Sequence, residues 1–255
     1  MEAHVSPKKG WFESVSEAYS KHRPHYPKAI FDWISNNAPC HKRCWDVACG
    51  NGQASLGLAK HFDRVDATDL SPSQISSASP HPRIHYRVGA AESSDLPEAS
   101  IDVIVVAAAI HWFDVPRFNA EVLRVIKPGG LMVWLGYDPL RSNYPLLQTW
   151  LDQLYGERLR SLWPPERKHV DRHYGDLPFP GPSDALPKGL SIQLEWSLED
   201  LLGFVGTWSP LRKAGHEREA LLQEISMELR GIWPKEQTTI ALSLPLMGRW
   251  GHPSP

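Results

Sequence analysis

Residues 45–53, which read WDVACGNGQ, decide the fold of this chain. Trp45 to Ala48 have the composition of a buried strand. A loop with two glycines follows, and then a helical pattern that we expect to run from Gln53 to about Phe62. Glycine lets the backbone pass close beneath a ligand, and the first turn of the next helix presents free N–H groups. The stretch therefore predicts a strand–loop–helix unit with a ligand site at its loop.

The alternation of strands and helices continues toward the C-terminus of this unit. Short apolar runs predict strands at 65–69, 84–88, 101–110 and 131–135, and amphipathic patterns predict helices that begin at 72 and span 116–126. Ser71-Pro72 is typical of a helix start, and the run from Lys127 to Gly130 is typical of a helix stop. This order predicts an α/β fold with a parallel, doubly wound sheet.

The segments on either side of this core have their own patterns. We expect a loose tail at 1–10, a helical stretch at 11–38 that breaks at 23–27, one helix at 144–162 and a rigid proline-containing stretch at 163–190. Late strands are expected at 191–194 and 240–246, with helices at 198–206 and 215–230 between them. We therefore interpret the chain as a single domain, divided into an N-terminal helical segment (1–43), a core (44–138), an insertion (139–190) and the late strands and helices (191–255).

The composition argues against several classes of protein. Lys and Arg number 27 against 29 Asp and Glu, for a net charge of −2, so a general nucleic-acid or anionic-membrane binder is not expected. No apolar run approaches the ~18–20 residues of a membrane span, and the first residues, MEAH, lack the pattern of a signal peptide. Cys40, Cys44 and Cys49 are too few for a disulfide framework and too irregularly spaced for a metal site, so we expect a cytoplasmic protein without a metal.

The residues around the glycine loop favour a nucleoside cofactor. Asp69 lies 17 residues after Gly52, at the end of the second expected strand, where a carboxylate can accept hydrogen bonds from a ribose diol. The alternative is a tight turn with a helix-capping Asp. Ser55 stands where a dinucleotide fingerprint has its third glycine, which argues against a nicotinamide oxidoreductase. Asp46 suits a cofactor with an amino-acid moiety better than one with a pyrophosphate.

Five segments in order resemble one known family, namely residues 46–53, 67–71, 89–92, 109–114 and 122–130. Together they resemble the class I S-adenosylmethionine-dependent methyltransferases, of the type that includes trans-aconitate methyltransferase. Upstream, Tyr19 and residues 23–27 are similar to the N-terminal segment of that subgroup. The resemblance implies a Rossmann-like sheet of seven mostly parallel strands with an antiparallel last strand, covered by an N-terminal helical lid and an insertion.

The resemblance also implies roles for individual positions. Gly50 and Gly52 would pass beneath the methionine part of the cofactor, Asp46 would organise its ammonium end, and Asp69 would hold the ribose. Ala91 and Glu92 would border the adenine. The other positions implied on the cofactor side are Tyr19, Arg23, Ala48, Gln53, Leu70, Ala108 and His111.

Three positions, Ala48, Ala90 and Arg23, leave questions open about this comparison. Ala48 replaces the usual first glycine of the loop, which is tolerable if the backbone there has a negative φ, and Ala90 stands where many relatives carry Asp. Arg23 would bind the cofactor carboxylate, with Tyr19 and Tyr26 closing the site as a lid. The same proline-flanked segment could equally be a surface connector.

Side chains after the central strand are candidates near the transferred methyl group. His111 is the best-placed base for a hydroxyl acceptor, or it only packs and hydrogen-bonds beside the cofactor. Trp112 and Phe113 could wall the substrate pocket and contact a sulfonium through their ring faces, or belong to the core. His173 lies in the basic stretch 167–174, which would recruit an acidic substrate or form a solvated charged face.

These observations predict a methyltransferase that uses S-adenosylmethionine, releases S-adenosylhomocysteine and methylates a small molecule, first of all on a carboxylate or hydroxyl oxygen. N- or S-methylation and a non-catalytic cofactor-binding protein are the alternatives. Residues 107–110 read AAAI where amino-methylating nucleic-acid enzymes carry Asn or Asp, two prolines and an aromatic residue. We therefore expect no nucleic-acid partner and no membrane partner, and a monomer or homodimer.

Overall fold

A nine-stranded sheet forms the centre of the computed structural model, which describes residues 23–254. Its strand order is β3-β2-β1-β4-β5-β9-β6, with β7 and β8 also paired to β9. The strands are β1 (Arg43–Val47), β2 (Arg64–Asp69), β3 (Ile84–Val88), β4 (Ile101–Ala107), β5 (Ile126–Tyr137), β6 (Arg141–Ser142), β7 (Ser183–Ala185), β8 (Ser191–Trp196) and β9 (Ile240–Gly251). Strands β1 to β5 pair in parallel, and β9 runs antiparallel to β5. The predicted mostly parallel α/β sheet with an antiparallel last strand is confirmed.

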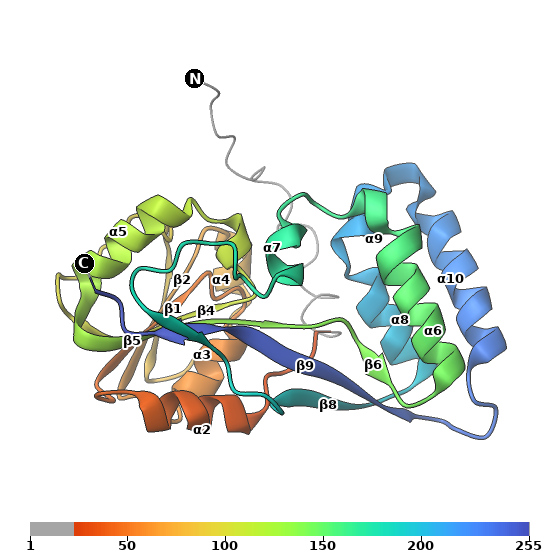
Figure 1. Ribbon diagram of the computed structural model, residues 1–255, viewed down its shortest axis with the longest axis horizontal. Coiled ribbons are helices and arrows are strands. Elements are labelled where there is room, and N and C mark those ends of the chain that lie inside the picture. Colours follow the sequence, from red (N-terminus) through yellow and green to blue (C-terminus); the bar gives the residue numbers. More distant parts are fainter. Residues whose placement is uncertain (1–22, 255) are drawn as a thin grey trace.

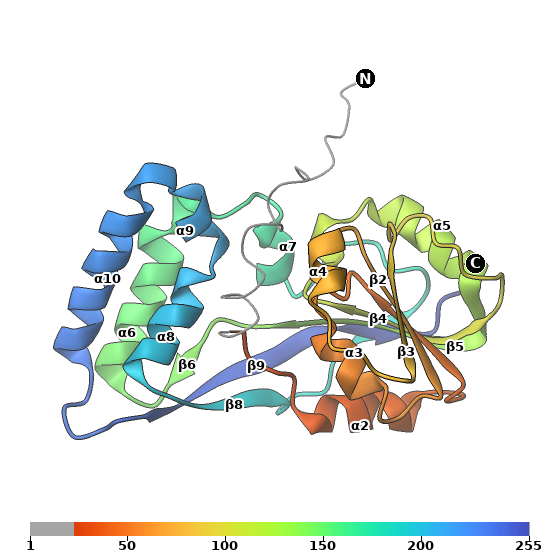
Figure 2. The same cartoon turned by 180° about the vertical axis from the view of Figure 1, so that it is seen from behind.

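The helices fall into two groups. They are α2 (Lys28–Asn37), α3 (Gln53–Leu58), α4 (Pro72–Ser76), α5 (Val115–Val125), α6 (Pro145–Gln153), α7 (Arg167–Asp171), α8 (Leu198–Gly206), α9 (Ser209–Lys213) and α10 (Arg218–Ile232). In Figures 1 and 2, α2 and α3 cover one face of the sheet and α5 covers the other, while α6, α8, α9 and α10 form a helical group over the far part of β6, β8 and β9. We call this helical group the cap, and α7 lies between it and the sheet (Figure 1).

Alternate residues of the central strands pack on opposite faces of the sheet. Val103 and Val105 of β4 belong to the core shared with α2 and α3, whereas Ile104 and Val106 belong to the core shared with α5. All four side chains are fully buried. A strand covered on both faces reads as a continuous apolar run, which is why the sequence of β4 shows no alternation.

Several boundaries differ from the sequence expectations. β4 ends at Ala107, and Ile110 begins a short 3₁₀ turn instead of closing the strand. The single helix expected at 144–162 ends at Gln153 and continues as a π-helical turn at Leu154–Arg158 and a 3₁₀ turn. Helix α3 ends at Leu58, four residues early. The tail at 1–10, the first helical piece and Tyr19 lie outside the described residues.

The described part of the chain holds no helix long and apolar enough to cross a membrane. Within the same part, no group of three or more His, Cys, Asp or Glu side chains is placed to hold a metal ion.

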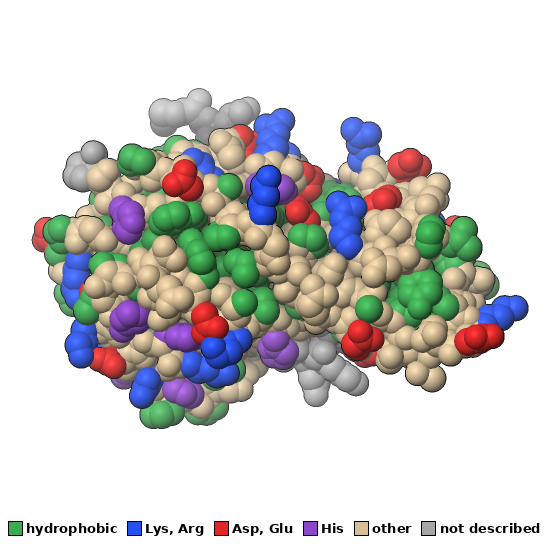
Figure 3. All heavy atoms as spheres, turned by 60° about the horizontal axis from the view of Figure 1, so that its bottom comes forward, with side chains coloured by type: hydrophobic (Ala, Val, Ile, Leu, Met, Phe, Trp, Pro, Cys, Tyr) green, Lys and Arg blue, Asp and Glu red, His purple; other side chains and the backbone are tan. Residues whose placement is uncertain are grey.

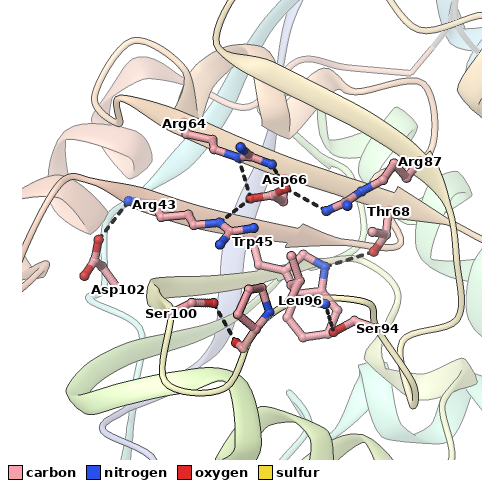
Figure 4. A network of polar contacts seen from close by, with 11 residues as sticks. Arg43, Trp45, Arg64, Asp66, Thr68, Arg87, Ser94, Leu96, Ser100 and Asp102 are labelled. Atoms are coloured by element: carbon pink, nitrogen blue, oxygen red, sulfur yellow. Dashed lines mark hydrogen bonds and ion pairs between the residues drawn. The ribbon is translucent and has the colours of Figure 1, made fainter.

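Away from the strand ends that carry the glycine loop, a buried carboxylate joins the first three strands. Asp66 of β2 is fully buried and accepts hydrogen bonds from Arg43 Nε at 2.6 Å, Arg64 Nη2 at 2.8 Å and Arg87 Nη2 at 2.7 Å (Figure 4). Burial alone would raise the pKa of Asp66, but the hydrogen bonds from Arg64 and Arg43 lower it below its ordinary value. Because the three arginines lie on β1, β2 and β3, this network fixes the edge of the sheet.

Replacing Asp66 tests this network. Asp66→Ala leaves three cations without their common acceptor, and we expect the free energy of unfolding to fall by about 3 kcal/mol at pH 7. Because the folded-state pKa is depressed, this contribution is present above the ordinary pKa of Asp and is lost as the pH falls through the folded value. Urea denaturation should therefore show the difference between the two proteins shrinking below about pH 4.

Asp63→Ala is the matched control for this substitution. Asp63 makes an ion pair with Lys42 in which both side chains are mostly exposed, so its loss should change stability little. Equal losses for the two variants would contradict the structural role of Asp66.

Candidate functional site

A large cavity opens where the parallel strands end. Its volume is about 610 Å³, within the usual range for small-molecule sites. The loops after β1, β2, β4 and β5 all reach its wall. The strand order reverses between β1 and β4, and ligands of open α/β sheets bind outside the carboxyl ends at such a point.

The cavity collects most of the positions singled out by the sequence. Those that line it are Arg23, Tyr26, Asp46, Ala48, Gly50, Gln53, Asp69, Leu70, Ala91, Glu92, Ala108, His111, Trp112 and Phe113. Gly52 and His173 are not part of this wall, and Tyr19 lies outside residues 23–254. Segments far apart in the sequence therefore meet at one site.

Asp69 ties two of the loops together. Its carboxylate accepts hydrogen bonds from the backbone N–H of Gly50 and from that of Ser71, both at 2.8 Å. Burial raises the pKa of Asp69 above its ordinary value, and the two backbone hydrogen bonds oppose that rise. Each carboxylate oxygen keeps a lone pair for a ligand, because these contacts use one site on each.

Asp46 is a fully buried carboxyl at the bottom of the cavity. Its Oδ2 accepts a hydrogen bond from Ser55 Oγ at 2.5 Å, while Oδ1 has no hydrogen-bond partner within the described chain. Burial raises the pKa of Asp46 to about 7, opposed by the hydrogen bond from Ser55. A buried acceptor of this kind is satisfied by a ligand that brings a donor or a positive charge.

The backbone at Ala48 corrects one expectation. Its φ is +53°, in the left-handed region, so the negative φ under which alanine would be tolerated at this position is absent. The chain turns there from β1 into the loop, where the N–H of Cys49 donates to the carbonyl of Thr68 at 2.9 Å. Alanine in this region is strained by roughly 1–2 kcal/mol.

Gly52 lies outside the cavity wall and allows the loop to pass close to β3. Its φ is +85°, and a Cβ atom at this position would lie 2.2 Å from the hydroxyl oxygen of Tyr86. The structure therefore assigns Gly52 to the close approach between the loop and β3. Gly50 does reach the wall, also with a positive φ, of +55°.

The 3₁₀ turn after β4 presents His111 to the cavity. Burial, and then the positive charges of Arg167 and His169, lower the pKa of His111 to about 3, so its ring is neutral at physiological pH. Nδ1 of His111 lacks a hydrogen-bond partner among residues 23–254, and so does the hydroxyl of the fully buried Tyr174. The two rings stack with centroids 6.3 Å apart. Two unsatisfied polar atoms therefore lie beside the same cavity.

Arg23 joins the N-terminal side of the site to the cap. One terminal nitrogen donates to the hydroxyl of Tyr137 and the other donates to the carbonyl of Thr207 at 3.4 Å. The guanidinium carbon also lies 5.4 Å from the ring centroid of Phe204. These contacts place Arg23 at the cavity between β5 and α8, not on an exposed connector.

The basic stretch 167–174 divides between the cavity and the surface. Arg167 lines the cavity, whereas Lys168 and Arg172 are exposed. His173 is also exposed and forms an ion pair with Asp138, with its Nε2 2.7 Å from the carboxylate. His173 therefore lies outside the cavity wall, beside the lining residue Asp138, and its role in the substrate pocket stays a prediction.

Sequence reasoning missed the cap side of the cavity. The aromatic residues there are Tyr155, Trp163, Phe204 and Trp208. The sequence showed a surplus of Trp and a helical pattern around residue 155, but no spacing linked these positions to the glycine loop. They meet only because the helices of the cap pack together.

The strain at Ala48 can be tested by stability. Ala48→Gly relieves a positive φ, and this gain exceeds the backbone entropy that glycine loses on folding, so we expect the free energy of unfolding to rise by about 0.5–1 kcal/mol. The control, Ala54→Gly, removes a buried methyl group from within helix α3 and should lower stability by about 1 kcal/mol. The same sign for both variants in urea denaturation would contradict the strain.

The ionisation of Asp46 predicts a pH effect on stability. Because the folded-state pKa is raised to about 7, the ligand-free protein holds a proton that the unfolded chain releases near pH 4, so stability falls as the pH rises toward 7. Relative to Asp46→Asn, the wild type should lose about 2 kcal/mol between pH 5 and pH 7.

Denaturation curves at the two pH values measure this difference. The control is Asp63→Asn, because the pKa of Asp63 is lowered by the hydrogen bond from Lys42 and its effect should appear only at lower pH. Wild type and Asp46→Asn following parallel pH profiles would show that Asp46 is already ionised at pH 5.

The chain is similar to several known methyltransferases. Residues 45–134 match the family described as a methyltransferase domain. A protein of Dictyostelium discoideum named as a methyltransferase is 33% identical over 202 residues, which cover 78% of this chain and 76% of that protein. The malonyl-[acyl-carrier protein] O-methyltransferase of Serratia marcescens is 33% identical over 91 residues, 35% of this chain and 36% of that enzyme. Several further curated relatives match over about half of their length.

A solved structure extends this similarity to nearly the whole chain. It is described as a type II methyltransferase from Anaeromyxobacter dehalogenans, is 41% identical and has a TM-score of 0.82, covering 91% of this chain and 99% of that chain. The shared sheet brings the glycine loop, Asp46 and Asp69 to one cavity. The chain therefore belongs to the S-adenosylmethionine-dependent methyltransferases.

Proposed function

We propose that this enzyme transfers a methyl group from S-adenosylmethionine to an oxygen atom of a small molecule and releases S-adenosylhomocysteine. The observation that carries the proposal is one cavity with two unlike halves. Acidic side chains and the glycine loop form one half, and aromatic side chains of the cap form the other. The first half suits the cofactor and the second suits an acceptor.

The residues of the first half fit the cofactor. The free Oδ1 of Asp46 offers an acceptor to the ammonium group, and the remaining lone pairs of Asp69 offer acceptors to the ribose hydroxyls. Gly50 leaves room for the methionine part, since a Cβ there would have Gln74 as its nearest neighbour, at 3.7 Å. Ala91 and Glu92 also line the wall, and Glu92 holds the turn before α5 by accepting from the N–H of Asp114 at 3.0 Å.

The chemistry required of the protein is mainly alignment. When bound, the cofactor supplies an electrophilic methyl group on a sulfonium, and in-line placement of the acceptor provides much of the rate. A neutral His111 with a pKa of about 3 is too weak a base to activate a hydroxyl efficiently, but it can orient an acceptor through a hydrogen bond. A carboxylate acceptor, which needs no base, therefore suits this site better than an alcohol.

A small acceptor is favoured by the shape and surface of the protein. The cavity lies between the sheet and the cap, and its wall includes residues of both. Figure 3 shows one face of the molecule on which basic and acidic side chains lie close to one another. Such an interspersed surface gives a nucleic acid little to follow. The name of the Serratia relative, an O-methyltransferase, supports oxygen as the acceptor atom.

Similarity to the trans-aconitate methyltransferase subgroup also stays part of the proposal. A cytoplasmic location is proposed as well, because the three cysteines of the chain are free.

The cofactor assignment is tested by calorimetry with S-adenosylhomocysteine and NAD. We expect micromolar binding of the former and none of the latter. Asp69→Ala should weaken binding of S-adenosylhomocysteine by roughly 100-fold, because two hydrogen bonds to a charged acceptor are lost. The control is Asp95→Ala, which alters an exposed residue in the loop before β4. Unchanged affinity of Asp69→Ala would exclude the ribose assignment, and binding of NAD instead would overturn the proposed function.

A further inference from the structure

The cap side of the cavity carries four aromatic rings in mutual contact. Tyr155 lies 4.9 Å from Trp163 between ring centroids, Trp163 lies 5.8 Å from Trp208, and Phe204 lies 5.8 Å from Trp208. We call these four residues the aromatic wall. All of them line the cavity, and they come from the stretch after α6 and from the region of α8 and α9. A surface of this kind binds flat apolar groups.

Two cations lie against this wall, Arg23 at Phe204 and Arg167 at the other end. The guanidinium carbon of Arg167 lies 5.1 Å from the ring centroid of Tyr155 and 5.0 Å from that of Trp163. Arg167 also lines the cavity, and only 22% of its side chain is exposed. Stacking against two rings fixes the plane of a guanidinium, so that it binds an anion with little further ordering.

The contact with Asp171 leaves much of the guanidinium available. Nε of Arg167 donates to the carboxylate of Asp171 at 3.3 Å, and the hydroxyl of Tyr155 donates to the same oxygen at 2.8 Å. The side chain of Asp171 is 50% exposed, so this ion pair within one helix is weak. A guanidinium has five N–H donors, and this hydrogen bond uses one of them. Asp171 therefore orients Arg167 without satisfying it.

The surroundings of Arg167 also favour an anion. Arg167 and His111 line the same cavity, and the positive charge of Arg167 contributes to the lowered pKa of His111. Arg23, which also lines the cavity and donates to the carbonyl of Thr207 at the end of α8, is a second cation near the cap. Of the carboxyl groups that line the cavity, Asp46, Asp69 and Glu92 lie on the loops after β1, β2 and β3. The fourth, Asp138, follows β5 and is paired with His173. An anionic ligand group is thus attracted to the cap half.

We infer that Arg167 is a specificity-determining residue, which binds a carboxylate of the acceptor while the aromatic wall packs against an apolar, ring-containing body. The acceptor class is therefore a small aromatic carboxylic acid. This inference rests on the proposed function, because it places the acceptor beside the cofactor half of the same cavity. It also separates Arg167 from its exposed neighbours Lys168 and Arg172.

The test uses the full chain saturated with S-adenosylhomocysteine. Phenylacetate, 3-phenylpropionate and 4-phenylbutyrate are titrated by calorimetry, each beside its uncharged primary amide. We expect at least one acid to bind tenfold or more tightly than its amide, since a hydrogen-bonded ion pair is gained. Arg167→Gln should remove this preference while leaving the affinity for the amides unchanged, and Arg167→Lys should restore part of it.

Two further variants separate the parts of the inference. Arg172→Gln changes an exposed arginine that directly follows α7 and pairs with Asp176, so the preference for the acid should persist. Trp163→Leu should weaken the acid and the amide by similar factors, because it removes the stacking surface and not the charge.

The outcomes distinguish this inference from the proposed function. Failure of the wild type to bind S-adenosylhomocysteine contradicts the proposed function, and with it the inference. If S-adenosylhomocysteine binds but no acid is preferred to its amide, or if the preference survives in Arg167→Gln, the inference is wrong while the cofactor assignment stands. Binding of S-adenosylhomocysteine to each variant shows that it is folded.

Discussion

Two backbone N–H groups that converge on the carboxylate of Asp69 are the constraint on which the site depends. One belongs to Gly50 after β1 and the other to Ser71 after β2, so a single side chain holds two loops at a fixed separation. The parallel register that pairs Val47 with Thr68 brings Asp69 level with the loop. A slip of one residue would turn Asp69 to the other face of the sheet and release both loops.

The features that could be predicted from the sequence depend on neighbouring residues. The start of α4 at Pro72 follows from Ser71, whose hydroxyl accepts from the N–H of Gln74 at 3.4 Å. Asp69 could be placed because a strand that ends in a carboxylate puts it at the edge of the sheet. The pattern of β4 identified a central strand, although it could not show that the strand ends at Ala107, three residues before the apolar run does.

The features that could not be predicted arise from tertiary packing. Tyr155, Trp163 and Trp208 reach the cavity that the glycine loop also lines because α10 packs against α6, α8 and α9. The π-helical turn at Leu154–Arg158 redirects the chain and has no recognisable local signal. Likewise, the orientation of the five-residue helix α7 decides which residues of the basic stretch 167–174 face the cavity and which are exposed. No charge pattern in the sequence reveals that orientation.

Ala48 shows why the most diagnostic stretch was also misjudged in part. An alanine in the loop favours negative φ by its own preference, yet both Ala48 and Ala108 have φ near +50°. They follow β1 and β4, the two strands between which the sheet order reverses, and both line the cavity. Strain of this kind persists where surrounding contacts determine the backbone, and it occurs most often at functional sites. Local propensity therefore failed at the point where the cavity is formed.

The division of charge across the cavity gives the proposed reaction a physical rationale. Transfer of a methyl group from a sulfonium to a carboxylate converts a cation and an anion into two neutral groups. A buried site disfavours isolated charges, so the reactants need local partners that the products do not. Asp46 and Asp69 lie on the side of the cationic reactant, and Arg167 lies on the side of the anionic one. The neutral ring of His111 adds no charge between them. If the carboxylate that Arg167 contacts is also the group that is methylated, its negative charge disappears in the proposed reaction. The contact with Arg167 then weakens, which favours release of the ester.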